Sequence, residues 1–213
     1  MKKIPARLQI TALVSLALAA IILTGVWLAI PVVRPDGGGA PVRTSGTALI
    51  GGPFELIDQS GQPVRDTDFL GRYMLVFFGF TFCPDVCPTE LQVMSAALDQ
   101  LEQRVGAQAL QVAPLFITVD PARDTPDVMA DYIGHFHPRM TGLTGSPAQI
   151  TQVTEAYRIY SRKVDDPGSA ARYTMDHSAV VYLMGPDGRF LAHFSPGTSP
   201  EAMADKIAGF LGG

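Results

Sequence analysis

Residues 74–88 have the sequence MLVFFGFTFCPDVCP, and this stretch decides how the rest of the chain is interpreted. It begins with an apolar run, Met74 to Phe78, which is short and rich in aromatic residues, as is typical of a buried strand. It ends with Cys83 and Cys87, the only two cysteines of the chain. After Pro88 the apolar residues recur at helical spacing. The pattern predicts that both cysteines lie between a strand and a helix, at the edge where parallel sheets collect functional groups.

The spacing of the two cysteines allows several kinds of chemistry. Thiols four residues apart can meet if the chain between them makes one turn. Pro84 and Pro88 prevent a regular helix from running through both, and Pro88 suits the first helical position, with Cys87 near the cap. The helix N-terminus there favours a thiolate. The pair can form a disulfide, exchange disulfides or bind a soft metal. A purely structural disulfide is the weakest interpretation, because closing so short a loop removes little chain entropy.

The N-terminal region has the pattern of a membrane anchor. Basic residues precede Leu8 to Val33, a mostly apolar segment without a charged residue. About 20 apolar residues span a bilayer, whereas the apolar part of a cleaved signal peptide has about 7–15. We therefore expect residues 1–33 to hold an uncleaved transmembrane helix. The basic head should keep the N-terminus cytoplasmic and place the remainder outside the inner membrane, in the periplasm.

Glycine and proline separate this segment from the rest of the chain. Residues 34–50 form an expected flexible linker, and residues 51–213 are expected to form one domain. The chain carries a net charge of −4 and has no basic patch interleaved with aromatic residues. We therefore expect no nucleic-acid partner.

Beyond the linker, strands and helices are expected to alternate. The expected elements after the first hairpin, which pairs 54–58 with 63–64, are the strand 74–78, the cysteine helix, a strand 112–119, a helix to about 136, a helical face with Ile150, Val153, Tyr157 and Tyr160, a loop 162–172, a strand 178–184, its hairpin partner 189–194 and a closing helix 200–211. Either Asp124 or Thr125 is expected to cap the helix that begins near Pro126, so the carboxylate of Asp124 is interpreted as structural. The order predicts an α/β fold with a central mixed sheet flanked by helices.

Several motifs together resemble the Sco/SenC family of copper-binding proteins, which has a thioredoxin-like fold. The matching pieces are residues 78–88, Thr118-Val119-Asp120-Pro121 with Arg123-Asp124-Thr125, residues 142–145, Asp176-His177-Ser178, and Tyr182-Leu183 with Pro186-Asp187-Gly188. They follow in the family's order from about Gly52 to the C-terminus. The resemblance implies copper delivery to, or thiol reduction at, the dinuclear copper site of cytochrome c oxidase. It implies a copper-accepting oxidase subunit, an upstream copper donor and a thiol reductant as partners.

The resemblance also implies the copper ligands, namely Cys83, Cys87 and His177. Ligand chemistry agrees, because thiolates suit Cu(I) and imidazole suits copper among other metals; Cu(II) binding stays open. Zinc prefers a fourth ligand, and none is obvious. Asp176 could orient His177, and Met175 could be an auxiliary ligand, although core packing suits it better. Of the other histidines, His135 and His137 are expected at a helix end or on the surface, and His193 is expected to be exposed.

Two other functions compete with copper delivery. A thiol–disulfide oxidoreductase could keep client cysteines reduced, and Cys83 and Cys87 are expected to form a reversible disulfide. Thioredoxin-like reductases usually have two residues between their cysteines, however, and a peroxiredoxin needs Thr or Ser at the position of Phe80. A copper or redox sensor is the second alternative, since a sensor could bind copper without transferring it.

Overall fold

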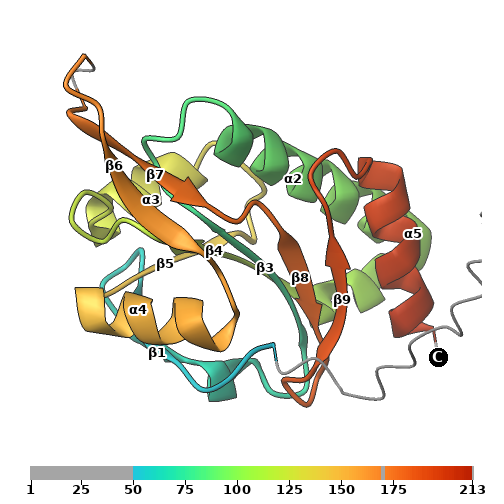
Figure 1. Ribbon diagram of the computed structural model, residues 1–213. Coiled ribbons are helices and arrows are strands. Elements are labelled where there is room, and N and C mark those ends of the chain that lie inside the picture. The colour runs from blue at the N-terminus through green and yellow to red at the C-terminus, as the bar shows by residue number, and fades with distance from the viewer. Residues whose placement is uncertain (1–49, 169–170, 213) are drawn as a thin grey trace, which may run out of the picture. The chain divides into compact units, whose positions relative to one another are not determined.

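A seven-stranded mixed sheet forms the centre of the structure, a computed structural model that describes residues 50–168 and 171–212. The strand order is β2-β1-β5-β4-β3-β8-β9 (Figure 1). The strands are β1 (Glu55–Asp58), β2 (Pro63–Arg65), β3 (Tyr73–Gly79), β4 (Val112–Thr118), β5 (Thr141–Thr144), β8 (Val181–Met184) and β9 (Phe190–Phe194). Strands β3, β4 and β5 run parallel, and the other pairs are antiparallel. The predicted central mixed sheet is thus confirmed.

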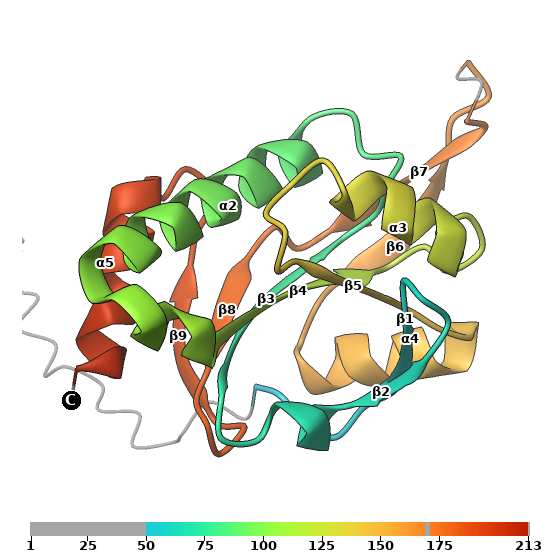
Figure 2. The same ribbon diagram turned by 180° about the vertical axis from the view of Figure 1, so that it is seen from behind.

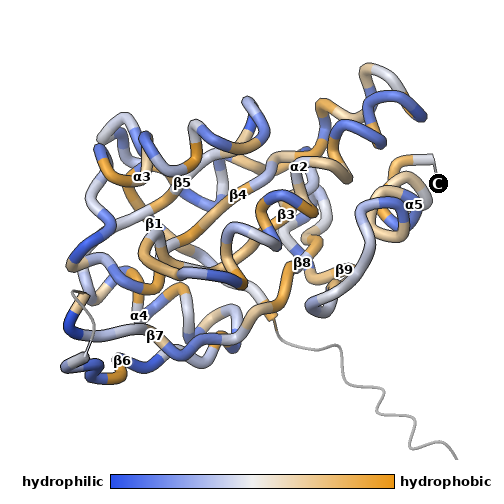
Figure 3. Tube along the Cα trace, turned by 90° about the horizontal axis from the view of Figure 1, so that it is seen from above, coloured by the Kyte–Doolittle hydropathy of each residue, from blue (hydrophilic) through white to orange (hydrophobic). Residues whose placement is uncertain are grey.

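Helices cover both faces of this sheet. They are α2 (Val86–Val105), α3 (Pro126–Ile133), α4 (Pro147–Ala156) and α5 (Pro200–Leu211), with 3-10 turns η1 (Asp66–Phe69) and η2 (Gly106–Gln111). Helices α2 and α3 lie on one face and α4 on the other (Figures 2 and 3). Helix α5 packs beside α2. Because both faces are covered, β3 from Met74 onward and the whole of β4 are buried, which explains their nearly unbroken apolar sequences.

The region predicted as a loop between 162 and 172 begins with strand residues, at 162–165. Strands β6 (Ser161–Asp165) and β7 (Tyr173–His177) pair antiparallel, with Ser161 opposite His177, and form a two-stranded sheet of their own. This hairpin projects from the body of the domain (Figure 1). The loop prediction was wrong for residues 162–165, because strands that pair through the backbone and stay largely exposed need no apolar pattern.

Several predicted boundaries also move. Helix α2 begins at Val86, so Pro88 is its third residue, and Cys87 lies in its first turn. Strand β8 begins at Val181, whereas the sequence suggested Ser178. Helix α3 ends at Ile133, short of 136, and strand β5 was not predicted. The helical face ends before Tyr160, because α4 stops at Ala156 and Tyr160 is 56% exposed.

The N-cap of α3 is one of the two residues that the sequence analysis proposed for this position. Thr125 is the N-cap, since its side chain accepts a hydrogen bond from the backbone N–H of Val128, and Pro126 follows at the first helical position. Asp124 is therefore free for another role, described below. The expected transmembrane helix and most of the linker lie outside the described residues. Among the residues that are described, none of the helices is both long and apolar enough to cross a membrane.

Candidate metal centre

The loop between β3 and α2 carries Cys83, leads into Cys87 in the first turn of α2, and is fixed by a buried carboxylate. The backbone N–H of Thr81 donates to Asp124 Oδ2 over 3.1 Å, and the Thr81 hydroxyl donates to Oδ1 over 2.6 Å. The hydroxyl of Thr118, the last residue of β4, donates to the same carboxylate. Asp124 thus ties the cysteine loop to the end of the neighbouring strand. Sequence analysis interpreted Asp124 only as a helix cap. The threonines near this sheet edge, which can donate hydrogen bonds to a carboxylate, could have indicated its buried role.

Three side chains meet beside this loop. The backbone N–H of Cys87 donates to Cys83 Sγ over 3.4 Å, and Cys87 Sγ lies 3.4 Å from His177 Nε2. The sulfur atoms and a ring nitrogen all lie within 4.8 Å of one another. Strand β7 supplies His177 as its last residue, 90 positions along the chain from Cys87. The structure therefore brings together the three residues that the sequence suggested as ligands.

The imidazole of His177 is held in a defined orientation. Its Nδ1 lies 3.1 Å from the carbonyl oxygen of Ser178, which can only accept a hydrogen bond. Nδ1 therefore carries the proton of the neutral ring, and the Nε2 lone pair faces Cys87. Phe80 meets the ring edge-on at a centroid distance of 5.7 Å. Aromatic packing and one backbone contact thus prepare Nε2 as a ligand atom.

Asp176 does not provide this orientation by direct contact. Its carboxylate pairs with Arg162 Nη2 at 3.2 Å across the β6–β7 ladder. Neighbouring residues of a strand point to opposite faces, which separates the side chains of Asp176 and His177. The group in contact with Nδ1 is the carbonyl of Ser178, and an orienting role of Asp176 stays a prediction.

The electrostatics of the two thiols differ sharply. The side-chain hydrogen bond with Cys87 is the main cause that lowers the pKa of Cys83 to about 3, against the opposing effect of burial. The same hydrogen bond, together with burial, raises the pKa of Cys87 above its usual range. The pair therefore holds a thiolate on half-buried Cys83 and keeps a proton on buried Cys87. This arrangement provides a nucleophile and a soft ligand in one place.

The floor of the site depends on a glycine. A Cβ atom on Gly79 would lie 2.7 Å from Cys87 Sγ and 2.8 Å from the ring of Phe116, closer than real contacts allow. The last residue of β3 must therefore be small for the Cys87 sulfur to reach its place. The open side is a pocket of about 200 Å³ lined by Cys83, His177 and their neighbours, which include Met175.

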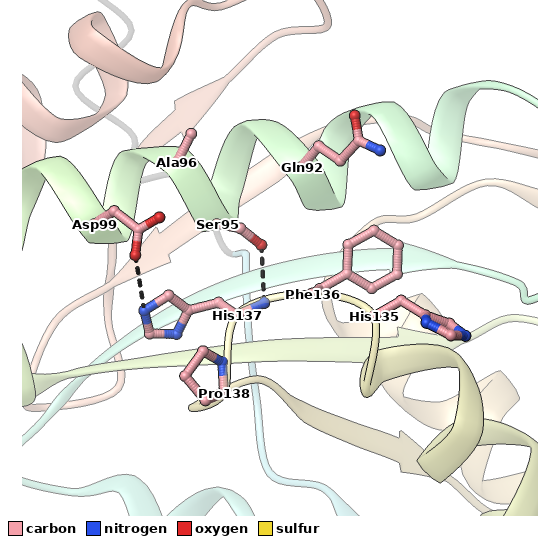
Figure 4. A pocket seen from close by; sticks show the side chains of 8 residues that line it. All are labelled: Gln92, Ser95, Ala96, Asp99, His135, Phe136, His137 and Pro138. Carbon is pink, nitrogen blue, oxygen red and sulfur yellow. Dashed lines mark hydrogen bonds and ion pairs between the residues drawn. The ribbon is translucent and has the colours of Figure 1, made fainter.

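The remaining histidines lie elsewhere. His193 on β9 is exposed, as predicted. His137 is buried, which corrects the expectation of a surface position: it lines a larger pocket of about 360 Å³ between α2 and the segment after α3 (Figure 4). Its Nδ1 accepts from the backbone N–H of Arg139 over 3.2 Å, so Nε2 bears the proton and faces the carboxylates of Asp99 and Glu102. A protonated Nε2 is no metal ligand, which distinguishes His137 from His177.

Comparison with known protein families matches residues 42–212 to SCO1/SenC. Protein SCO2 homolog, mitochondrial, from Bos taurus is 42% identical over 207 residues, covering 94% of this chain and 73% of that protein. Protein SCO1 homolog 1, mitochondrial, from Arabidopsis thaliana is 40% identical over 164 residues, covering 77% of this chain but only 48% of that longer protein. The solved structure of Bradyrhizobium japonicum ScoI with copper bound is 45% identical, with a TM-score of 0.68, and the match covers 76% of this chain and 99% of that one.

Proposed function

Because the chain belongs to the SCO1/SenC family, we propose that it binds copper through Cys83, Cys87 and His177 and delivers it to the dinuclear copper site of cytochrome c oxidase. One observation carries the proposal. In residues 50–168 and 171–212, these side chains are the only group of three or more His, Cys, Asp and Glu residues whose ligand atoms all come within 4.8 Å of one another. The related structure from Bradyrhizobium japonicum was solved with copper bound.

The donor set fits copper better than the common alternatives. Two sulfurs and one imidazole nitrogen suit Cu(I), which accepts soft ligands and low coordination numbers. Zinc in structural sites usually takes four ligands. Hard cations such as Mg²⁺ and Ca²⁺ prefer oxygen, which this group lacks.

Each residue has a distinct role in taking up the metal. Cys83 is already favoured as the thiolate, so Cys87 is the group that must release a proton on loading. His177 offers Nε2 without losing a proton, because its Nδ1–H faces Ser178. Both thiols must be reduced for binding, and an external thiol reductant is therefore part of the proposal.

The setting proposed for this activity is the outer face of an inner membrane. Residues 1–33 are proposed as a single transmembrane anchor, residues 34–50 as the linker, and the remainder as a periplasmic domain. The partners are an upstream copper donor and the copper-accepting oxidase subunit. A truncated protein beginning at Gly46 should stay folded by circular dichroism, because the glycine-rich linker isolates the anchor. A largely unfolded product would show that the boundary is wrong.

Anaerobic titration with Cu(I), followed by mixing with the metal-free copper-accepting oxidase subunit, tests the proposal. We expect one tightly bound Cu(I) per molecule and its appearance on the oxidase subunit after separation of the two proteins. A protein that binds Cu(I) but never transfers it would instead be a sensor. A protein that binds none would refute the proposed function.

A second function, reduction of a client disulfide, is favoured by the unequal exposure of the two cysteines. Cys83 is half-buried and has the lowered pKa, whereas Cys87 is buried behind it. The Cys83 thiolate would attack the client disulfide and release one client thiolate, and Cys87 would then resolve the mixed disulfide. The products are two client thiols and an oxidised Cys83–Cys87 pair, which the thiol reductant restores. Release of client thiols without copper would identify this activity.

A further inference from the structure

The position of His177 raises a question that the ligand set does not answer. His177 ends a hairpin that forms its own two-stranded sheet, whereas the cysteines lie where the main sheet leads into α2, with Cys87 in the first turn of that helix. At the base of the hairpin, Ser178 N–H donates to the Tyr160 carbonyl over 3.0 Å, and Tyr160 N–H donates to Ser178 Oγ over 3.1 Å. These hydrogen bonds fix the base of the hairpin. The direction in which the hairpin points must be set by other contacts.

Tyr173, the first residue of β7, makes those contacts. It lies four residues before His177 and therefore on the same face of the strand. Its hydroxyl donates to Asp120 Oδ1 over 3.0 Å. Arg123 Nη1 donates to its carbonyl oxygen over 3.1 Å, and the Arg123 guanidinium lies 3.8 Å from the centroid of its ring. The hairpin is thus docked on the segment that follows β4.

The same guanidinium reaches the cysteine loop. Its carbon lies 4.9 Å from the ring centroid of Phe82, which precedes Cys83, and 5.8 Å from that of Phe80. Phe80 is the ring that meets His177 edge-on. Arg123 Nε also pairs with Asp120, which limits where the guanidinium can lie. Arg123 is therefore in contact with both parts of the site at once.

We propose that Arg123 is a positioning residue that sets the distance between His177 and the cysteine pair, by clamping Tyr173 of the hairpin against Phe80 and Phe82 of the cysteine loop. The inference rests on the proposed copper function. The planar guanidinium suits this task because it stacks on rings and donates in its plane at the same time. Its Nη2 atom is buried and makes no hydrogen bond among the described residues, so stacking and the Nε and Nη1 bonds hold the group.

The test compares variants of the full-length protein in mild detergent. Arg123→Met removes the charge and the planar group, Tyr173→Leu removes the ring, and Arg123→Lys keeps only the charge. Lys163→Met is the matched control, because Lys163 Nζ lies 3.9 Å from the same Tyr173 ring yet belongs to the hairpin itself. Cu(II) affinity, measured by competition with a chelator, should fall about 10–100-fold in Arg123→Met and Tyr173→Leu. The Cu(II) affinity of Arg123→Lys should lie between those of Arg123→Met and the wild type. The affinity of Lys163→Met should equal that of the wild type.

Testing Arg123→Met in a protein that already lacks His177 distinguishes a positioning role from a general loss of stability. If Arg123 acts through His177, Arg123→Met should cause no further loss of Cu(II) affinity in a protein that already carries His177→Ala. An equal loss in both backgrounds would overturn the proposal, as would wild-type Cu(II) affinity in Arg123→Met.

The metal-free protein supplies a readout that is independent of copper. Nuclear Overhauser contacts between the rings of His177 and Phe80 should be present in the wild type and in Lys163→Met, and should weaken in Arg123→Met. If the wild type bound no copper, the proposed function would fail, while these contacts would still decide whether Arg123 holds the histidine. Unchanged contacts in Arg123→Met would refute the clamp.

Discussion

The two halves of the candidate metal centre are built in opposite ways. Cys83 lies on the loop after the buried strand β3, which Asp124 fastens to β4, and Cys87 lies in the first turn of the long helix α2. His177 lies at the end of a short hairpin that pairs with no other strand of residues 50–168 and 171–212. The thiol half is therefore fixed by the core of the domain, and the imidazole half is fixed by a few docking contacts.

This difference separates two properties of the site. The thiol chemistry depends on groups that cannot move without disturbing the core, and it should persist in most variants. The geometry of a three-ligand site depends on the hairpin and should be easier to change. Variants that affect one half and spare the other therefore test the comparison directly.

The largest expected effect comes from oxidising the thiol half. A disulfide between Cys83 and Cys87 removes both sulfur ligands, so the oxidised protein should lose tight Cu(I) binding completely. Anaerobic titration before and after treatment with a thiol reductant measures this, and reduction should restore binding. Equal Cu(I) affinity of the oxidised and reduced forms would mean that the dithiolate site is wrong.

The next effect concerns the imidazole half. His177→Ala should weaken Cu(II) by more than about 10–100-fold, the range typical of losing an outer partner, because Cu(II) prefers nitrogen donors. Cu(I) should weaken less, since two thiolates can still hold it, and the disulfide chemistry should stay nearly unchanged. Competitive titration with X-ray absorption measures affinity and the nitrogen count.

His193→Ala is the control for the loss of an imidazole, because His193 is exposed on β9. It should leave copper binding unchanged. If His193→Ala lost affinity and a nitrogen neighbour while His177→Ala kept both, the third ligand would have to be reassigned to His193.

A smaller effect is expected beneath the thiol half. Gly79→Ala places a methyl group 2.7 Å from Cys87 Sγ, and such overpacking typically costs about 1–3 kcal/mol of the free energy of unfolding. Urea denaturation of the metal-free protein measures it. Gly209→Ala is the matched control, because a Cβ on Gly209 of α5 would meet no atom within 4 Å and should be neutral or slightly stabilising. Equal stability of the two variants would contradict the tight floor of the site.

The smallest effect should lie outside both halves. Burial is the largest cause that lowers the pKa of His137, and the charge of Arg139 lowers it as well. The negative charges of Glu102 and Asp99 oppose this by raising the pKa. The neutral ring is therefore favoured in the folded state, and its contribution to stability is present above the unfolded pKa of about 6.5 and lost as the pH falls below it. The free energy of unfolding should decline less between pH 7.5 and pH 5 in His137→Gln than in the wild type. An equal decline would show that His137 does not contribute.

The sequence predicted the fold because its buried elements carry strong patterns. The strands β3 and β4 could be identified from their short, nearly unbroken apolar runs, and α2 from the helical spacing of its apolar residues. The β6–β7 hairpin could not, because its strands are mostly exposed and held by backbone pairing. Sequence analysis accordingly placed His177 at the start of a core strand, although it closes a separate hairpin.

The three candidate ligands could be named from motifs, but the residues that hold them could not. Arg123 and Tyr173 lie 50 positions apart in sequence, and nothing local indicates that they meet. Asp124 has the sequence context of a helix cap, and only the fold shows that its carboxylate is buried between Thr81 and Thr118. Contacts of this kind depend on the tertiary structure, and they decide the geometry of the site.

The unequal burial of the two cysteines also decides which sulfur other molecules can reach. Cys87 is enclosed by the core, whereas half-buried Cys83 lines the open pocket. Under the proposed function, an incoming ligand from a donor or a client would meet the metal on the side of this pocket, where Cys83 is the more accessible of the two sulfur ligands. A client disulfide would reach Cys83 through the same pocket. Copper transfer and thiol exchange, as proposed above, would therefore use the same pocket and the same sulfur, so one molecule could not carry out both at once.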